Sequence, residues 1–136
     1  MNTPLSKAYI IIVEDNQNDQ LIALDLLRLG GANRCYSRKM VDIAIEFAEK
    51  LPTVDLFLVD VNIPGRSGYE LLAEIRLHET LNYAKVVALT AGTQESEVER
   101  ARELGFDGFI SKPLKSDLFA KQVQDILNGK LVWDRR

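Results

Sequence analysis

Short apolar runs alternate with longer amphipathic stretches along most of the chain. The apolar runs are typical of buried strands, and the stretches between them carry apolar residues at the spacing of a helix. Strands are expected at 8–13, 34–39, 55–60, 84–90 and 105–111, and helices at 20–31, 41–51, 67–78, 94–104 and 114–127. Five strands that alternate with five helices indicate a parallel sheet with helices on both faces.

The second expected strand decides the order of the sheet. Residues 34–39 are polar, whereas both faces of a central strand in such a sheet are covered. This strand therefore belongs at an edge, which favours the flavodoxin-like order 2-1-3-4-5 of a doubly wound, five-stranded parallel sheet. The chain then divides into an N-terminal extension (1–7), one α/β domain (8–128) and a C-terminal tail (129–136).

Composition narrows the classes of function. The 136 residues are 46% hydrophobic and 27% charged, as in a single globular domain. The net charge of −3 and the pI of about 5.2 argue against a nucleic-acid-binding surface, which is usually basic. Cys35 is the single cysteine, and the chain has neither a signal-peptide-like start nor an apolar run long enough to span a bilayer. We expect a cytoplasmic protein with no direct contact to nucleic acid or membrane.

Charged and polar residues collect where the expected strands end. Glu14 and Asp15 follow the first strand, Asp60 ends the apolar run LFLVD, and Thr90 and Lys112 end the fourth and fifth strands. The carboxyl ends of parallel strands meet at one edge of the sheet, where ligands bind in folds of this type. Three carboxylates at such close range repel one another, and a hard divalent cation such as Mg²⁺ removes that conflict.

This set of residues fits phosphoryl transfer, in which catalysis is mostly positioning and charge neutralisation. A carboxylate can itself be the nucleophile and form an aspartyl phosphate. Glu14 and Asp15 are adjacent and suit a shared metal ion, whereas Asp60 stands alone on the neighbouring strand. Asp60 is therefore the expected phosphoacceptor.

The same residues make the chain resemble the receiver domain of two-component response regulators, over about residues 8–128. Intervals of 30 residues from Asp60 to Thr90 and of 22 residues from Thr90 to Lys112 are usual for that family. Because the chain leaves no room for an output domain, we expect a stand-alone receiver of the chemotaxis-regulator type. The matching features are Glu14-Asp15, Asp60 with Pro64 and Gly68 after it, Thr90-Ala91 and Lys112-Pro113.

The resemblance implies a metal site. Asp15 would bind Mg²⁺ directly, and Glu14 would bind it directly or through water. A carboxylate oxygen of Asp60 and the backbone carbonyl of Asn62 would complete the protein ligands.

The resemblance also implies a phosphoryl site and a switch. Lys112 would pair with the phosphoryl group, through a cis peptide bond to Pro113. Thr90 would hydrogen-bond a phosphoryl oxygen, and Phe109 would then turn inward and change the face of helix 4, strand 5 and helix 5. Gly92 has no side chain to position an attacking water, which leads to the hypothesis of a long-lived phosphoryl group.

The expected partners follow from the same resemblance. The donor would be the phosphohistidine of a sensor histidine kinase or a phosphotransfer protein, and the effector, still unknown, would bind the helix 4–strand 5–helix 5 face. The first helix has more apolar residues than one buried face needs, so it has either a wide core face or a docking surface for the donor. Trp133 in the tail either folds back onto the domain or serves a partner or homodimer contact.

Three other functions compete with this interpretation. A haloacid-dehalogenase-like aspartyl phosphatase uses similar residues but needs a second Asp two positions after the nucleophile, where this chain has Asn62. An interaction module that works without phosphorylation usually lacks one of the acidic residues or the lysine, and here all are present. A phosphate sink for a shared kinase has the same sequence features as a signalling receiver. We expect no enzyme activity beyond the protein's own phosphorylation and dephosphorylation.

Overall fold

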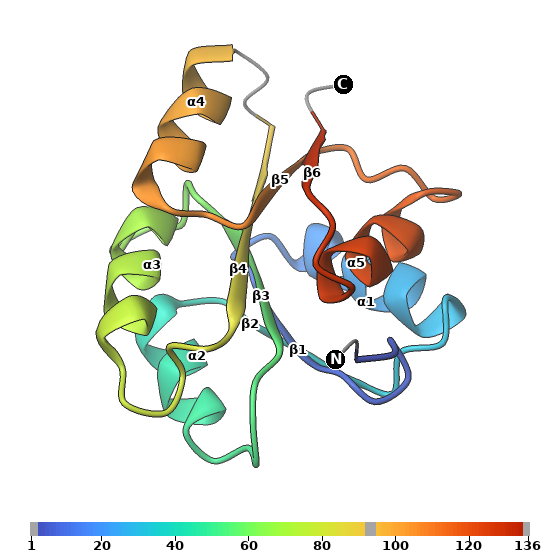
Figure 1. The fold of residues 1–136 in the computed structure, drawn as a ribbon, viewed down its shortest axis with the longest axis horizontal. Helices are drawn as coiled ribbons and strands as arrows, with labels where there is room; N and C mark the ends of the chain where they lie inside the picture. The colour runs from blue at the N-terminus through green and yellow to red at the C-terminus, as the bar shows by residue number, and fades with distance from the viewer. Residues whose placement is uncertain (1–2, 92–94, 135–136) are drawn as a thin grey trace.

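The structure is a computed structural model, and it describes residues 3–91 and 95–134 (Figure 1). Strands and helices alternate as the hydrophobic pattern predicts. The strands are β1 (Tyr9–Val13), β2 (Arg34–Arg38), β3 (Leu56–Asp60), β4 (Lys85–Thr90), β5 (Gly108–Ser111) and β6 (Val132–Asp134). The helices are α1 (Gln17–Leu29), α2 (Val41–Ala48), α3 (Gly68–Leu77), α4 (Glu95–Leu104) and α5 (Phe119–Leu127).

All strands pair in parallel, and within the described residues their order is β2-β1-β3-β4-β5-β6. The flavodoxin-like fold, the order 2-1-3-4-5 and the edge position of the polar strand are confirmed. The number of strands is not, because β6 adds a sixth strand from the segment expected to be a tail. Three residues are too short for a periodic pattern. What makes them a strand is the open edge of β5, where Trp133 lies opposite Phe109.

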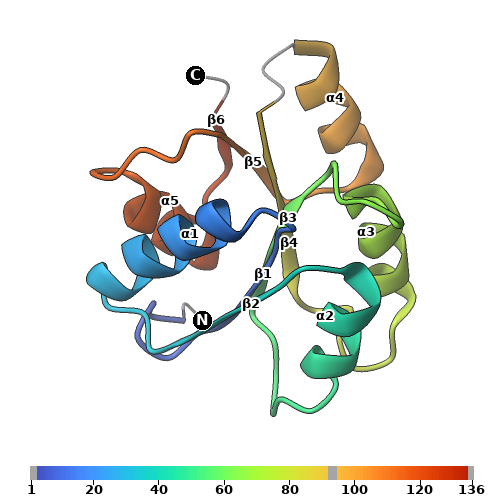
Figure 2. The ribbon, with the colours of Figure 1, turned by 180° about the vertical axis from the view of Figure 1, so that it is seen from behind.

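The sheet separates two groups of helices, with α1 and α5 on one face and α2, α3 and α4 on the other (Figures 1 and 2). Alternate strand residues point to opposite faces. Thus Ile10 and Ile12 pack in the core under α1 and α5, while Ile11 and Val13 pack in the core under the other three helices. This double burial explains why β1, β3 and β4 are continuous apolar runs.

Helix boundaries differ from the expected ones by one to five residues where the local hydrogen bonding departs from the apolar pattern. Helix α1 begins three residues early because the side chain of Asn16 caps it. Helix α2 ends at Ala48, with Glu49 as its C-cap, because the amides of Lys50 and Leu51 bond three rather than four residues back. Helix α5 begins at Phe119, after a turn that starts at Lys115.

The segment before β1 is tied to the end of the fold. Leu5 is buried in the core under α1 and α5, and its backbone N–H donates to Gln124 Oε1 at 2.7 Å. The side-chain amide of Gln124 donates in turn to the carbonyl of Thr3 at 3.2 Å. Residues 3–7, expected to be an extension, thus contribute to the core. Over the described ranges, none of the helices combines the length and apolar character that crossing a bilayer requires.

Candidate functional site

The carboxyl ends of four neighbouring strands bring the predicted site residues together. Asp60 and Thr90 are the last residues of β3 and β4, and Lys112 follows the last residue of β5. Val13, which pairs with Val59, leads directly into Glu14 and Asp15. The predicted residues therefore meet at one edge of the sheet, as the parallel topology requires.

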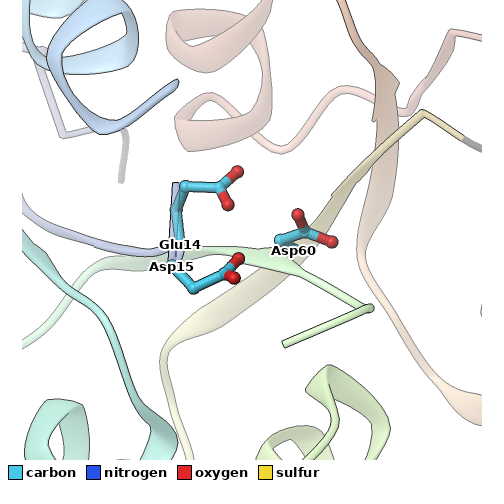
Figure 3. A group of neighbouring side chains, drawn as sticks. All are labelled: Glu14, Asp15 and Asp60. Atoms are coloured by element: carbon cyan, nitrogen blue, oxygen red, sulfur yellow. The ribbon is translucent and has the colours of Figure 1, made fainter. Parts of the chain in front are cut away.

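Three carboxylates form a compact acidic cluster at this edge. One oxygen each from Glu14, Asp15 and Asp60 lies within 4.8 Å of the others, and Figure 3 shows the first two side chains extending from the end of β1 toward the Asp60 side. Glu14 is 2% exposed and Asp60 is 7% exposed, whereas Asp15 faces solvent. Oxygen donors of this kind, with one side open to water, fit Mg²⁺, which binds through few carboxylates and keeps several waters.

Lys112 is the cation that faces this cluster. Its ammonium donates to Glu14, to Asp60 Oδ2 at 2.9 Å and to Asp19 Oδ2 at 3.0 Å. Burial by itself lowers the pKa of Lys112, but the hydrogen bonds to these carboxylates outweigh it and leave the pKa raised. Lys112 is thus held as a cation. For Glu14 the effect of burial prevails over its bond to Lys112 and raises the pKa.

Both oxygens of the Asp60 carboxylate have partners. Oδ1 accepts the backbone N–H of Asn62 at 2.8 Å, and Oδ2 accepts from Lys112. The side-chain amide of Asn62 also donates to the hydroxyl of buried Thr90, at 3.4 Å. This pairing links the second residue after β3 to the end of β4. The backbone carbonyl of Asn62 as a metal ligand stays a prediction.

A glycine keeps the β3–α3 loop close to β3. A Cβ atom at Gly68 would lie 2.8 Å from Cα of Val61 and 2.9 Å from a methyl carbon of Val59, so another residue would push the loop outward. Ser67 caps α3 by accepting the backbone N–H of Glu70 at 3.2 Å.

Phe109 lies in the core and not on the surface. It is 1% exposed and lines a cavity of about 320 Å³ together with Asn62, Tyr69 and Thr90. Its predicted movement stays a prediction.

The Lys112–Pro113 peptide is cis, as expected. Gly92 lies outside the described residues.

Helix α1 presents apolar side chains to solvent as well as to the core. Ala23, Leu24 and Leu27 are buried, but Leu21 and Ile22 are about half exposed, at 49% and 48%. Ile22 also lines a hollow of about 80 Å³ whose wall includes Lys112. The helix therefore has both a core face and an exposed apolar face beside the acidic cluster.

Two residues of the site were not predicted from the sequence. In the sequence, Asp19 is an ordinary acidic residue in the first turn of a helix, and this position alone does not indicate a role in the site. Gln20 is buried, with its amide N–H donating to the carbonyl of Glu14 at 2.5 Å and its carbonyl accepting from Ser37 at 3.2 Å. Gln20 thereby fixes the backbone of the acidic pair against β2.

The tail folds back onto the domain, in agreement with one of the two interpretations of Trp133, and a partner or homodimer contact through this residue stays a prediction. Its ring packs against the core cluster that contains Phe109, and the guanidinium of Arg102 lies 4.5 Å from the ring centroid. Strand β6 thus covers the β5 edge next to α4.

Several known proteins are similar to this chain in sequence or in fold. The polar-differentiation response regulator DivK of Brucella ovis is 30% identical over 118 residues, which cover 87% of this chain and 94% of that protein. The chemotaxis response regulator CheY4 of Vibrio cholerae has a similar fold, with a TM-score of 0.79 at 21% identity over 88% of this chain and 98% of that one. A signal receiver domain of a histidine kinase from Syntrophus aciditrophicus gives a TM-score of 0.77 at 29% identity, over 90% and 91% of the two chains.

The family-level match covers most of the fold described above. Residues 10–124 match the response regulator receiver domain, a span that includes every residue of the acidic cluster as well as Thr90 and Lys112. The chain therefore belongs to the response regulator receiver domain family.

Proposed function

We propose that Asp60 accepts a phosphoryl group from the phosphohistidine of a sensor histidine kinase or phosphotransfer protein, and that phosphorylation changes the binding of an effector. The observation that carries the proposal is that the acidic cluster faces the partly buried ammonium of Lys112. Glu14, Asp15 and Asp60 offer oxygens within 4.8 Å of one another, and Lys112 donates to Asp60 at 2.9 Å.

In the reaction, a carboxylate oxygen of Asp60 attacks phosphorus while the bond from phosphorus to the imidazole nitrogen of the donor breaks. The electron pair of that bond stays on the imidazole nitrogen, which takes a proton, and Asp60 becomes an acyl phosphate. Glu14, Asp15 and Asp60, with the Asn62 carbonyl, would hold Mg²⁺, which would supply positive charge against the transferring group. Lys112 adds a fixed positive charge at the same place.

The donor would approach over the exposed face of α1. Leu21 and Ile22 are about half exposed beside the hollow that Lys112 lines. An apolar patch next to an acceptor suits a partner that must bring its phosphoimidazole within reach of Asp60.

The output would arise from the Thr90 side of the site. A phosphoryl oxygen on Asp60 would accept a hydrogen bond from the Thr90 hydroxyl. In the structure, the oxygen of this hydroxyl accepts from the side-chain amide of Asn62. The change would reach Phe109 through the cavity that these residues share and alter the α4–β5–α5 face, where the effector binds. Trp133 of β6 packs beside Phe109 and so belongs to that face.

In this reaction the protein is itself the molecule that is phosphorylated, and it does not turn over a separate substrate as an enzyme does. Asn62 stands where a haloacid-dehalogenase-like phosphatase needs its second Asp. We expect the reaction in the cytoplasm, with Cys35 reduced. A phosphate sink shares every step up to the acyl phosphate and differs only in having no effector.

Phosphate uptake from acetyl phosphate in Mg²⁺ tests the proposal. The wild type should gain one phosphoryl group by intact-protein mass spectrometry, and Asp60→Asn should gain none. Equal uptake by both proteins, or none by the wild type even with a cognate kinase, contradicts the proposal. Turnover of a generic phosphatase substrate would favour the phosphatase.

A further inference from the structure

Asp19 occupies an unusual position for an acidic residue in the first turn of a helix. It is the third residue of α1, after the N-cap Asn16, whose side chain accepts its N–H at 3.0 Å. A carboxylate at this position usually reaches back to the N-cap backbone N–H. Here that N–H donates to Glu14 Oε2 at 3.1 Å, and the Asp19 carboxylate contacts Lys112 at 3.0 Å instead.

The contact places Asp19 in competition for the ammonium of Lys112. An ammonium has three N–H donors, and Glu14, Asp60 and Asp19 each accept from it. A phosphoryl oxygen arriving at Asp60 therefore needs a donor that one of these carboxylates gives up.

Asp19 is the carboxylate that Lys112 can leave at the lowest cost. Its side chain is 39% exposed, against 2% for Glu14 and 10% for Asp60, so water can replace the lysine at Asp19. Leaving Glu14 would instead leave a buried carboxylate without its cation, with the N–H of Asn16 on its other oxygen. Asp60 itself is the site of reaction and must stay close to Lys112.

We propose that Asp19 is a positioning residue that occupies one N–H donor of Lys112 before phosphorylation and releases that donor when the phosphoryl group arrives. The inference rests on the proposed function and deepens it by assigning a residue that sets the phosphorylation rate. Asp19 also adds negative charge that repels an incoming phosphate donor. Both effects slow phosphorylation in the wild type.

The test compares Asp19→Asn with Asp25→Asn, a variant with the same charge change at an exposed position of the same helix. Phosphorylation by acetyl phosphate in saturating Mg²⁺ is followed by intact-protein mass spectrometry; the acetate leaves with the electron pair of the broken phosphorus–oxygen bond. Asp19→Asn should be phosphorylated about fivefold faster than the wild type, the range of a partly exposed ion pair. Asp25→Asn and Asp19→Glu should stay within about twofold.

An unchanged or slower rate for Asp19→Asn, or an equal acceleration by Asp25→Asn, overturns the inference. A second measurement is independent of phosphorylation: hydrogen exchange of the Lys112 ammonium, followed by nitrogen–proton NMR. It should become about fivefold faster in Asp19→Asn and stay unchanged in Asp25→Asn, because only the first variant replaces a charged acceptor of Lys112 with a neutral and weaker one. If the wild type takes up no phosphate, the proposed function fails, and the exchange rates still decide whether Asp19 holds Lys112.

Discussion

The two edges of the sheet hold their carboxylates in opposite ways. At the amino edge, Asp55 accepts the N–H of Tyr9 at 2.8 Å, and Asp107 accepts the N–H of Val86 at 2.8 Å and the guanidinium of Arg76 at 2.7 Å. Each acidic residue there has a backbone donor of its own. These pairs join the starts of neighbouring strands and have a structural role.

At the carboxyl edge, several carboxylates share one cation. Glu14, Asp19 and Asp60 all accept from Lys112, and Asp15 lies in the same acidic cluster. At the amino edge Asp55 and Asp107 each have a donor of their own, whereas at the carboxyl edge the carboxylates outnumber the cation that they share. Negative charge that the fold leaves in excess at this edge is the basis for proposing a metal ion and a phosphoryl group there.

The largest expected effect comes from the shared cation. Lys112→Met should slow phosphorylation of Asp60 by about 100-fold, as removal of a preorganised positive charge does at other phosphoryl-transfer sites. The rate from acetyl phosphate measures it. Arg76→Met, which removes the cation of the amino edge, is the matched control and should stay within about twofold. Similar phosphorylation rates for the two variants would contradict the different roles of the two edges.

A smaller effect, on stability, is expected at the amino edge. Asp107→Ala leaves the N–H of Val86 and the guanidinium of Arg76 without this acceptor, so the free energy of unfolding should fall by about 2 kcal/mol. Urea denaturation measures the change, with Asp25→Ala as an exposed control. Phosphorylation of the Asp107→Ala variant should match the wild type. A loss of phosphorylation with unchanged stability would contradict a structural role.

The smallest expected effect is that of the metal ion on folding. Mg²⁺ at ten times its dissociation constant should raise the free energy of unfolding by about 1.4 kcal/mol, because it binds only the folded cluster. Asp15→Asn should reduce this increase, whereas Asp25→Asn should leave it in place. Thermal unfolding with Mg²⁺ and then with excess chelator measures the difference. An equal response of the two variants would place the ion elsewhere.

Much of the fold and the acidic cluster followed from local patterns. The apolar run from Leu56 to Val59 predicted a doubly covered strand, and Asp60 at its end predicted a carboxylate at the binding edge. Parallel topology then placed Glu14, Asp15, Thr90 and Lys112 with it, since parallel strands end at one edge. The cap at Ser67 is also local, because its partner Glu70 is three residues away.

Other features depended on contacts between distant parts of the chain. Strand β6 forms because β5 leaves an open edge, and Leu5 is buried because α5 provides Gln124 as a partner 119 residues away. The exposure of Leu21 and Ile22 depended on how α1 packs on the sheet, which the six leucine and isoleucine residues of this helix left open.

The sequence by itself determined the α/β architecture, the edge that carries the site and the residues of the acidic cluster, because these follow from patterns a few residues long and from strand direction. Only the tertiary structure decided which carboxylates share Lys112. Asp19 lies 93 residues from Lys112, and the two meet because α1 packs beside the end of β5. An ion pair across that distance depends on packing geometry, which no local pattern encodes.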